Sequence, residues 1–521
     1  MKISFRSASI GSPKGRRTGR RLWLVLFTLV STGASAESLP ENASGDAGSL
    51  SAVLRSVSSA RMLADVQTLS GETFQGRQTG SAGDLRAAEW VAARFAALRL
   101  TVAPVLPAEA SDSSSSLRDP VPSVPVYVIG DGPRLEALTA QGTAMGRAPD
   151  DYLPILDSPP VDATAPVVFV GYGISDPARG YDEYAGLDVR NRIVLFMRGK
   201  PDHYPLPVSH AEKERLAREN GAVAFLTVTG PILNPYEARR GMTTAPSAFY
   251  GRQAGSIPLP GAWISPAFAD RLLSSRVAGA QPLRALQESV NQTRRPHSRP
   301  TGSVVRMAWD GLRASGPLYN VIASIPGRDP DLKEQPVILG AHRDHFGRQA
   351  GLLFPGADDN ASGTAVVLEV ARVLVESGLQ PARTITFVSF DGEEQGLLGS
   401  QLYVDRHVKG PVKPGGMVNV DHAGIGNGRL TVGVTGFDKR VAQEAGQAAG
   451  LAEQLDLFGF FPGGDHVPFK EAGIPTITVV SGGPHVHYHK PTDTPDTVNP
   501  HILESAVRYV LTLVWQLAGS H

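Results

Sequence analysis

The chain has 521 residues with 50 basic and 50 acidic side chains, and it contains no cysteine. This length predicts two domains rather than one, and the lack of cysteine excludes disulfides and thiolate ligands, so any metal site must be built from His, Asp and Glu. Without the basic leader described next, the formal charge is 43 − 50 = −7, which argues against nucleic acid as a partner, since nucleic-acid binding needs a basic face.

Residues 1–36 have the pattern of a signal peptide. Seven basic residues and no acidic one lie before the apolar stretch Leu22–Val30, and Ala34-Ser35-Ala36 precedes Glu37. The apolar stretch is short for a membrane span, and the small residues fit a cleavage site. We therefore expect an exported protein, periplasmic or secreted, with no stable membrane insertion after cleavage. Arg20-Arg21 loosely resembles a twin-arginine signal, so the export route stays open, as does an uncleaved anchor.

The leader carries a first prediction. The mature protein is expected to begin near Glu37, because Ala34-Ser35-Ala36 fits the specificity of signal peptidase. N-terminal sequencing of the exported protein checks this, and recovery of Met1 would contradict it.

Residues 37–115 are expected to form the N-terminal part of a catalytic domain. Val53–Leu69 has helical spacing, and Leu85–Leu98 carries an apolar face at intervals of three and four residues. Asp84 is the expected N-cap of this second helix.

Residues 120–300 have a different sequence pattern. Short apolar strands separated by turns are expected at Val126–Ile129, Pro166–Tyr172, Ile193–Met197 and Val223–Val228. Ser- and Pro-rich Ser111–Pro125 precedes the block, and Gln292–Gly302 follows it as a return linker. The block has no dense His or carboxylate cluster at a strand end, so we interpret it as a β-rich domain inserted into the first one.

Residues 301–521 alternate strands and helices. Apolar β-branched runs at Pro336–Ala341 and Thr384–Phe390 are typical of buried strands. Helices are expected at Ala361–Ser377, Leu397–His407, Lys439–Ala449 and Pro500–Ala518. The alternation predicts an α/β fold, a mainly parallel mixed sheet covered by helices on both faces.

Metal-binding and proton-transferring residues follow the strands of this region, where open α/β sheets place their sites. Ten of the 13 His lie after residue 340. The candidate metal ligands are His342, Asp358, Glu394, Asp421 and His489. Two His and three carboxylates are more ligands than one tetrahedral zinc accepts. They suit two Zn²⁺ per chain that share a carboxylate, with Mn²⁺ or Co²⁺ possible. Asp358, which lies between the others in sequence, is the expected bridging ligand.

Several roles stay open at this point. Asp344 can hold the far ring nitrogen of His342, two residues before it. In Glu393-Glu394 one carboxylate can bind metal while the other takes a proton, and spacing does not assign the two roles. His485, His487 and His489 alternate, and any one could be a ligand. For His345 we expect a packing or supporting role. Asp465-His466 could line the site or begin a helix.

Five segments in order resemble the motifs of the dinuclear zinc aminopeptidases, a family that includes bacterial leucyl aminopeptidase and aminopeptidase Y and has glutamate carboxypeptidase and glutaminyl cyclase among its relatives. They read GAHRDHFG, GADDNASG, FDGEEQGLLGS, NVDHAG and YHKPTDT. The resemblance covers residues 319–521 and the N-terminal helices. Residues 120–300 resemble a protease-associated domain.

The resemblance implies roles for these residues. Glu393 would be the general base, acting on water at the metals, and Glu394 a ligand. Asp358 would bridge, Asp344 would orient His342, and His489 would be the last ligand. A cis peptide bond is implied between Asp358 and Asp359, while Arg343 and Asp391 occupy positions that vary in the family.

The sequence therefore predicts an exported two-zinc exopeptidase, an aminopeptidase acting on peptides. Competing hypotheses are a carboxypeptidase on the same scaffold, a glutaminyl cyclase with one zinc, and a non-catalytic binding protein. Side-chain preference and oligomeric state are not predicted.

Overall fold

The computed structural model describes residues 50–102, 122–139, 141–233, 243–251, 258–273 and 280–519. The expected signal peptide and the cleavage site before Glu37 lie outside the described residues. Among the described helices, none combines the length and the apolar character that a membrane span requires.

The first of two eight-stranded sheets contains the strands whose ends hold the predicted site residues. Its order is β1-β14-β18-β15-β19-β22-β20-β21. The pairs β15–β18, β15–β19, β19–β22 and β20–β21 are parallel, and the others are antiparallel. This confirms the predicted mixed, mainly parallel sheet. The bounds are Thr101–Val102 (β1), Val321–Ile325 (β14), Ile385–Phe390 (β18), Val337–His342 (β15), Gly416–Val420 (β19), Thr476–Ser481 (β22), Leu430–Thr435 (β20) and Leu455–Phe458 (β21).

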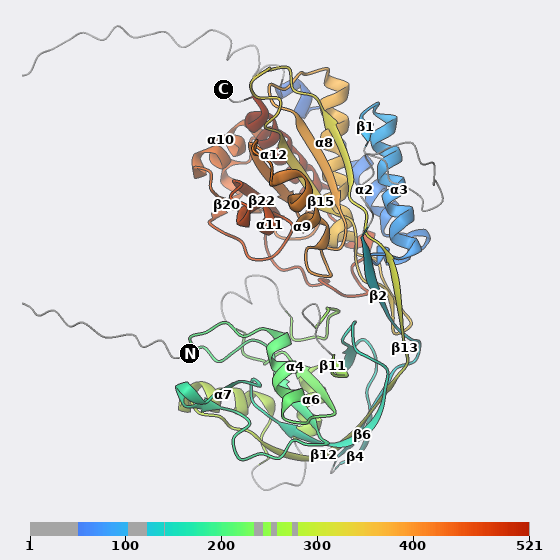
Figure 1. Cartoon of the computed structure of the whole chain (residues 1–521), viewed down its shortest axis with the longest axis vertical. Helices are drawn as coiled ribbons and strands as arrows, with labels where there is room; N and C mark the ends of the chain where they lie inside the picture. Colours follow the sequence, from blue (N-terminus) through green and yellow to red (C-terminus); the bar gives the residue numbers. More distant parts are fainter. Residues whose placement is uncertain are drawn as a thin grey trace, which may run out of the picture. The chain divides into compact units, whose positions relative to one another are not determined.

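Helices cover both faces of this sheet (Figure 1). Alternate residues of a strand point to opposite faces, so Val337 and Leu339 of β15 join the larger core while Ile338 joins the smaller one. The helices are α2 (Ser59–Leu69), α3 (Ala82–Ala97), α8 (Gly363–Ser377), α9 (Leu398–Tyr403), α10 (Lys439–Ala449), α11 (His466–Glu471) and α12 (Pro500–Gly519). Burial on both faces explains why the central strands are apolar throughout.

The predicted N-cap of α3 was wrong by three residues. Ser81, not Asp84, caps the helix, and its hydroxyl accepts the Asp84 backbone N–H at 3.2 Å. The helix α2 begins at Ser59, later than the expected Val53, because Ser58 caps it there. In both cases a serine hydroxyl satisfies a backbone N–H of the first turn, which is the usual reason a helix begins where it does.

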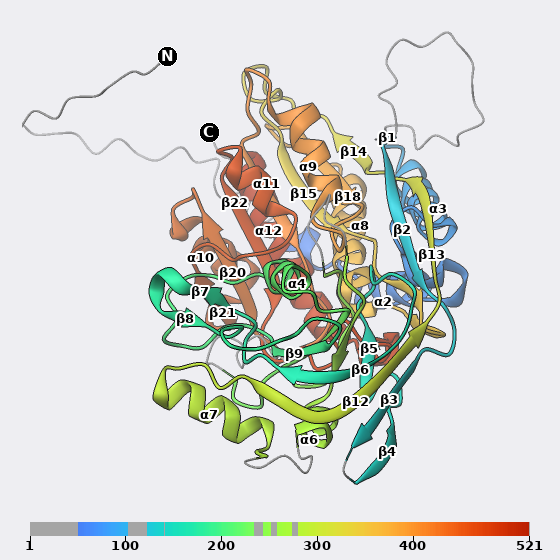
Figure 2. The ribbon, with the colours of Figure 1, turned by 60° about the horizontal axis from the view of Figure 1, so that its bottom comes forward.

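Residues between the two parts of the first sheet form a second eight-stranded sheet, ordered β4-β3-β12-β6-β9-β10-β11-β5. Its long strands β6 (Val161–Phe169) and β12 (Arg299–Trp309) run side by side (Figure 2). The other strands are β3 (Arg134–Thr139), β4 (Gly142–Met145), β5 (Tyr152–Pro154), β9 (Ile193–Met197), β10 (Ala224–Val228) and β11 (Gly261–Ile264), and the helices are α4 (His210–Glu219), α6 (Pro266–Leu273) and α7 (Leu283–Thr293).

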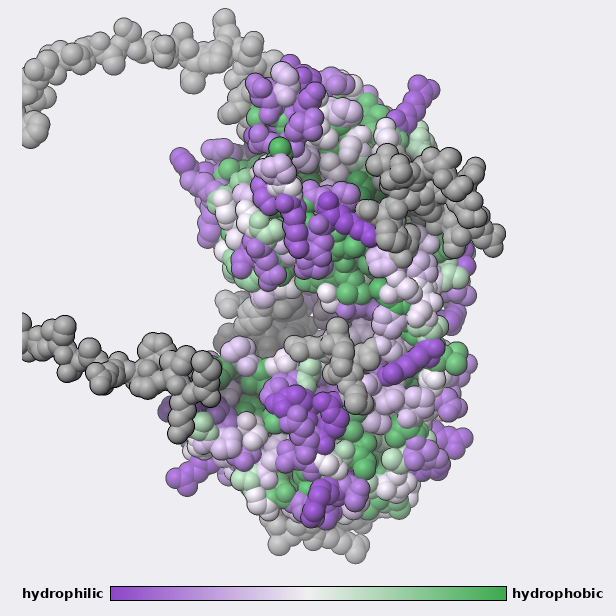
Figure 3. Space-filling model, viewed as in Figure 1, coloured by the Kyte–Doolittle hydropathy of each residue, from purple (hydrophilic) through white to green (hydrophobic). Residues whose placement is uncertain are grey.

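An antiparallel ribbon of β2 (Ser123–Ile129) and β13 (Gly311–Pro317) carries the chain into and out of this second sheet. Since β12 ends at Trp309, the second sheet extends past residue 300. The domain limits stay a prediction. On the face shown in Figure 3, hydrophilic residues are interspersed with hydrophobic ones.

Candidate metal centre

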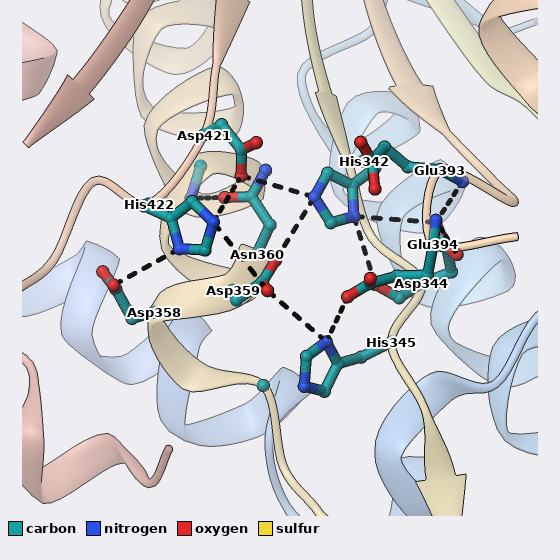
Figure 4. Close-up of polar contacts among 12 residues, drawn as sticks. His342, Asp344, His345, Asp358, Asp359, Asn360, Glu393, Glu394, Asp421 and His422 are labelled. Atoms are coloured by element: carbon teal, nitrogen blue, oxygen red, sulfur yellow. Dashed lines mark hydrogen bonds and ion pairs between the residues drawn. The ribbon is translucent and has the colours of Figure 1, made fainter. Parts of the chain in front are cut away.

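The predicted site residues meet beyond the carboxyl ends of neighbouring strands (Figure 4). His342 ends β15, Glu393 and Glu394 follow β18, and Asp421 follows β19 directly. The turn η3 (Ala357–Ser362) places two more carboxylates beside them. This convergence is what parallel pairing of β15 with β18 and β19 produces.

Asp359, rather than Asp358, lies between two groups of ligand-type side chains. Its Oδ1 is 3.4 Å from His342 Nε2, and its Oδ2 is 3.1 Å from His489 Nε2. The two Asp side chains diverge because Asp359 and Asn360 leave helical conformation within η3. The structure thus places Asp359, and not the expected Asp358, where a carboxylate could bridge two metals. The cis peptide bond also lies one residue later than expected, between Asp359 and Asn360.

One group consists of His342, Asp359 and Asp421, each offering an atom within 4.8 Å of the other two. His342 Nε2 lies 3.4 Å from an oxygen of each carboxylate. Burial opposes the charged forms, but the imidazoles of His422 and His342 hold the pKa of both carboxyls below its usual value. The set offers one nitrogen and two carboxylate oxygens to a cation.

The second group consists of Asp359, Glu394 and two imidazoles. His345 Nδ1 lies 2.7 Å from Glu394 Oε1, and His489 Nε2 lies 3.4 Å from Glu394 Oε2. Sequence reasoning expected only a supporting role for His345, although its position three residues after His342 was an available signal. With either imidazole, the group offers nitrogen and carboxylate ligands to a cation on the Oδ2 side of Asp359.

Asp344 fixes the turn that carries the two glutamates. Its carboxylate accepts the backbone N–H groups of Glu393 at 3.1 Å and Glu394 at 3.3 Å, and the Thr79 hydroxyl at 2.9 Å. It lies 3.6 Å from His342 Nδ1, while its carbonyl oxygen lies 3.2 Å from the same nitrogen. Asp344 thus contacts the His342 ring, as expected, and in addition holds Glu393 and Glu394.

The ring of His489 is held from outside the first sheet. Its Nδ1 lies 2.9 Å from the Ala248 carbonyl oxygen, and the Ala248 N–H donates to the His489 carbonyl at 2.8 Å. A carbonyl only accepts, so Nδ1 carries the hydrogen and Nε2 presents its lone pair to Asp359 and Glu394. Burial lowers the pKa of His489, which favours the neutral ring that a metal needs.

This contact gives a prediction about the part that residues 120–300 play in metal binding. Ala248→Pro removes the N–H that donates to the His489 backbone carbonyl, which should move the Ala248 carbonyl away from the His489 ring. Zinc binding should then weaken by about 10–100-fold, as it does on loss of a ring-orienting partner. Competition with a chelator measures the affinity. Lys490→Met is the control, because it removes the nearby contact of Lys490 with Thr243 (3.0 Å) and leaves Ala248 in place. Equal affinities in all three proteins would contradict the orienting role.

Arg77, which the sequence did not single out, ties the site to the N-terminal segment. Its guanidinium donates to the carbonyls of Arg343 (2.6 Å), Leu69 (2.6 Å), Pro355 (2.7 Å) and Gly356 (2.7 Å). The side chain is fully buried, and burial lowers its pKa to about 10. Four buried carbonyls thus depend on one side chain next to the turn that holds Asp359.

Arg77→Met is expected to lower the free energy of unfolding by about 3–5 kcal/mol, because four buried carbonyls lose their donor. Urea denaturation measures the change. Arg348→Met is the matched control: Arg348 pairs with Glu72 at the surface, and such pairs contribute about 0–1 kcal/mol. Similar unfolding free energies for the two variants would contradict the assignment.

Two other predicted positions, Arg343 and Asp465, are buried. Arg343 is buried and forms ion pairs with Asp84 at 3.0 Å and Asp391 at 3.2 Å. Asp465 occupies the N-cap position of α11 but makes no capping hydrogen bond through its side chain, and burial raises its pKa to about 7.

The buried groups fit a divalent cation. Among the described residues, Asp359 Oδ2 and Asp421 Oδ1 are buried without a hydrogen-bond partner. Burial raises the pKa of Glu393 and Glu394 well above the usual range, and neighbouring carboxylates add to the shift. Cations would satisfy the unpartnered atoms and neutralise the carboxylates. Imidazole and carboxylate without thiolate are ligands that zinc accepts.

Comparison with known proteins agrees with this chemistry. Residues 320–514 match the model of peptidase family M28. Aminopeptidase YwaD of Bacillus subtilis (strain 168) is 34% identical over 173 residues, 31% of this chain and 38% of that protein. A probable leucine aminopeptidase of Arthroderma otae is 31% identical over 216 residues, 38% of this chain and 57% of that protein. The chain thus spans between about a third and three fifths of the length of these curated relatives.

Solved structures share the fold over most of the chain. The aminopeptidase from Aneurinibacillus sp. strain AM-1 gives a TM-score of 0.62 at 23% identity and covers 89% of this chain and 95% of its own. The peptidase M28 precursor from Shewanella amazonensis SB2B gives 0.61 at 19% identity, covering 92% and 97%. The likeness extends well beyond the residues that the family model matches.

Proposed function

Because residues 320–514 form a peptidase family M28 domain, we propose that this protein is an exported aminopeptidase that holds two zinc ions per chain. The observation that carries the proposal is the position of Asp359, with its two carboxylate oxygens 3.4 Å from His342 and 3.1 Å from His489. A carboxylate flanked in this way can serve two metals at once.

In this proposal His342, Asp421 and Asp359 hold one zinc, and Asp359, Glu394 and His489 hold the other. Zinc, when bound, polarises the scissile carbonyl and lowers the pKa of a bound water. Asp344 keeps the His342 ring and the Glu393–Glu394 turn in place through the contacts described above. His345 lies against Glu394 and supports it.

Glu393 moves protons. It is not part of either ligand group, and Asp344 holds its backbone beside Glu394. Burial raises the pKa of its carboxyl well above the usual range, with His342 opposing the shift. A carboxylate with a raised pKa can accept a proton from the attacking water and return it to the departing amine.

The charges of the site favour a substrate amine over a substrate carboxylate. Among the described residues, the buried cations beside the site are Arg77 and Arg343, and both are already engaged, by carbonyls and by Asp84 and Asp391. A carboxypeptidase would need an available cation for the terminal carboxylate, so the aminopeptidase hypothesis is preferred.

A cleavage profile tests the proposal. The purified chain is offered aminoacyl anilides and three versions of one peptide, with both ends free, with the N-terminus blocked, and with the C-terminus blocked. We expect cleavage of the anilides, the free peptide and the C-blocked peptide only. Cleavage of the N-blocked but not the C-blocked peptide would indicate a carboxypeptidase. Cyclisation of an N-terminal glutamine with a single zinc per chain would indicate a glutaminyl cyclase.

For residues 120–300 we propose an inserted protease-associated domain. The second sheet and its position in the chain support this, and the contact of Ala248 with His489 gives the region a part in the site.

A further inference from the structure

A second cluster of metal-ligand side chains lies beside the proposed dinuclear centre. Asp358, His422 and His485 each offer an atom within 4.8 Å of the other two. They come from η3, from the end of β19 and from the turn after β22, so long stretches of sequence separate them. We propose that these three residues bind a further divalent cation of the zinc class. The inference does not depend on the proposed peptidase activity.

Asp358 is oriented toward the two imidazoles by the backbone. Its Oδ1 accepts the N–H groups of Gly424 at 2.8 Å and Ile425 at 3.0 Å. Its Oδ2 lies 2.6 Å from His485 Nδ1 and 3.5 Å from His422 Nδ1. One oxygen is therefore fixed by the protein, and the other is directed at two ring nitrogens.

His485 presents a lone pair to this oxygen. Its Nε2 lies 3.0 Å from the Ser481 carbonyl oxygen, and because a carbonyl only accepts, Nε2 carries the ring hydrogen. In the neutral ring, Nδ1 then has a lone pair 2.6 Å from Asp358 Oδ2. Two lone pairs at this distance repel, so without a proton the two groups would move apart, and a cation with ligands at about 2.0 Å could then bind both. A ring that donates one N–H to a backbone carbonyl and keeps its other nitrogen for the metal is the usual arrangement of a metal-binding His.

His422 supplies the third donor. Its Nδ1 is buried and has no hydrogen-bond partner among the described residues. Ser481 holds the backbone of His422, because the Ser481 N–H and hydroxyl both donate to the His422 carbonyl, the former at 2.9 Å. A buried ring nitrogen without a partner is costly, and a cation at Nδ1 would remove this cost.

The cluster is separate from the dinuclear centre. His422 Nε2 faces Asp421 at 3.6 Å and Asp359 at 3.8 Å, while Nδ1 faces Asp358. Figure 4 shows Asp358 and Asp359 on different sides of the His422 ring. Two nitrogens and one carboxylate oxygen suit Zn²⁺ with a solvent molecule as the fourth ligand.

Zinc stoichiometry tests the inference. The full chain is saturated with zinc, passed through a gel-filtration column and analysed for metal by mass spectrometry. His485→Gln should hold about one zinc ion fewer per chain than wild type, since a site with one of three ligands removed loses most of its affinity. His487→Gln is the matched control: it changes a neighbouring His that contacts Thr492 at the surface, and it should hold as much zinc as wild type.

Asp358→Asn provides a second variant, because the amide oxygen can still accept the N–H groups of Gly424 and Ile425. It should also lose about one zinc ion, since a neutral amide is a poor zinc ligand. If His485→Gln does not fold, the zinc content of Asp358→Asn is compared with that of wild type and His487→Gln instead. Zinc contents equal to wild type in the folded variants would mean that a protonated His485 simply donates to Asp358, and the inference would be overturned. Absence of peptide cleavage by wild type would reject the proposed function and leave this result standing.

Discussion

Replacing Glu393 with alanine is expected to lower kcat by about 10²–10⁴-fold while the chain keeps its fold and its zinc. Glu393 belongs to neither ligand group, so its loss removes no metal donor. The lost contribution is proton transfer to and from the reacting groups, because the neighbouring Asp344 carboxylate is already engaged by the backbone N–H groups of Glu393 and Glu394. Steady-state kinetics with an aminoacyl anilide, together with metal analysis, measures both quantities.

Glu394→Ala is the matched comparison. Glu394 lies 2.7 Å from His345 and 3.4 Å from His489, so its removal takes a donor from one group and should lower zinc content as well as rate. If Glu393→Ala were the variant that lost zinc and Glu394→Ala stayed fully loaded, the two roles would be reversed.

Asp359→Ala is expected to have the largest effect of any single change. Asp359 is shared between both ligand groups, so its removal should lower zinc content by about two ions per chain. Turnover should then fall to the rate without enzyme, because carbonyl polarisation and water activation are both lost. Metal analysis and kinetics on the purified variant check this, with circular dichroism to confirm the fold.

Asp358→Asn is the control that separates the neighbouring residues. It should leave the two ions at Asp359 in place, because Asp358 faces His422 and His485 instead. Loss of both of these ions in Asp358→Asn, with full retention in Asp359→Ala, would restore Asp358 as the bridging ligand.

The sequence by itself determined the elements on which the site is built. The strand β9 and the helix α10 have the predicted bounds, β15 is shifted from its prediction by one residue at both ends, and β18 differs by one residue at its start. These elements could be predicted because their signals are local. A buried strand shows a run of β-branched residues, and a helix shows an apolar period of 3.6 residues. Parallel strands then place His342, Glu393 and Glu394 at one edge of the sheet, a consequence that could be drawn without coordinates.

Only the tertiary structure decided which of two adjacent carboxylates is shared. Asp358 and Asp359 are equivalent in composition and spacing, and the direction of each side chain depends on the backbone torsions of the kinked turn η3. The tertiary structure also decided the contacts between residues distant in sequence, such as Ala248 with His489 and Asp358 with His485. Such pairs are formed by the packing of elements distant in the chain, and no local period or spacing encodes them.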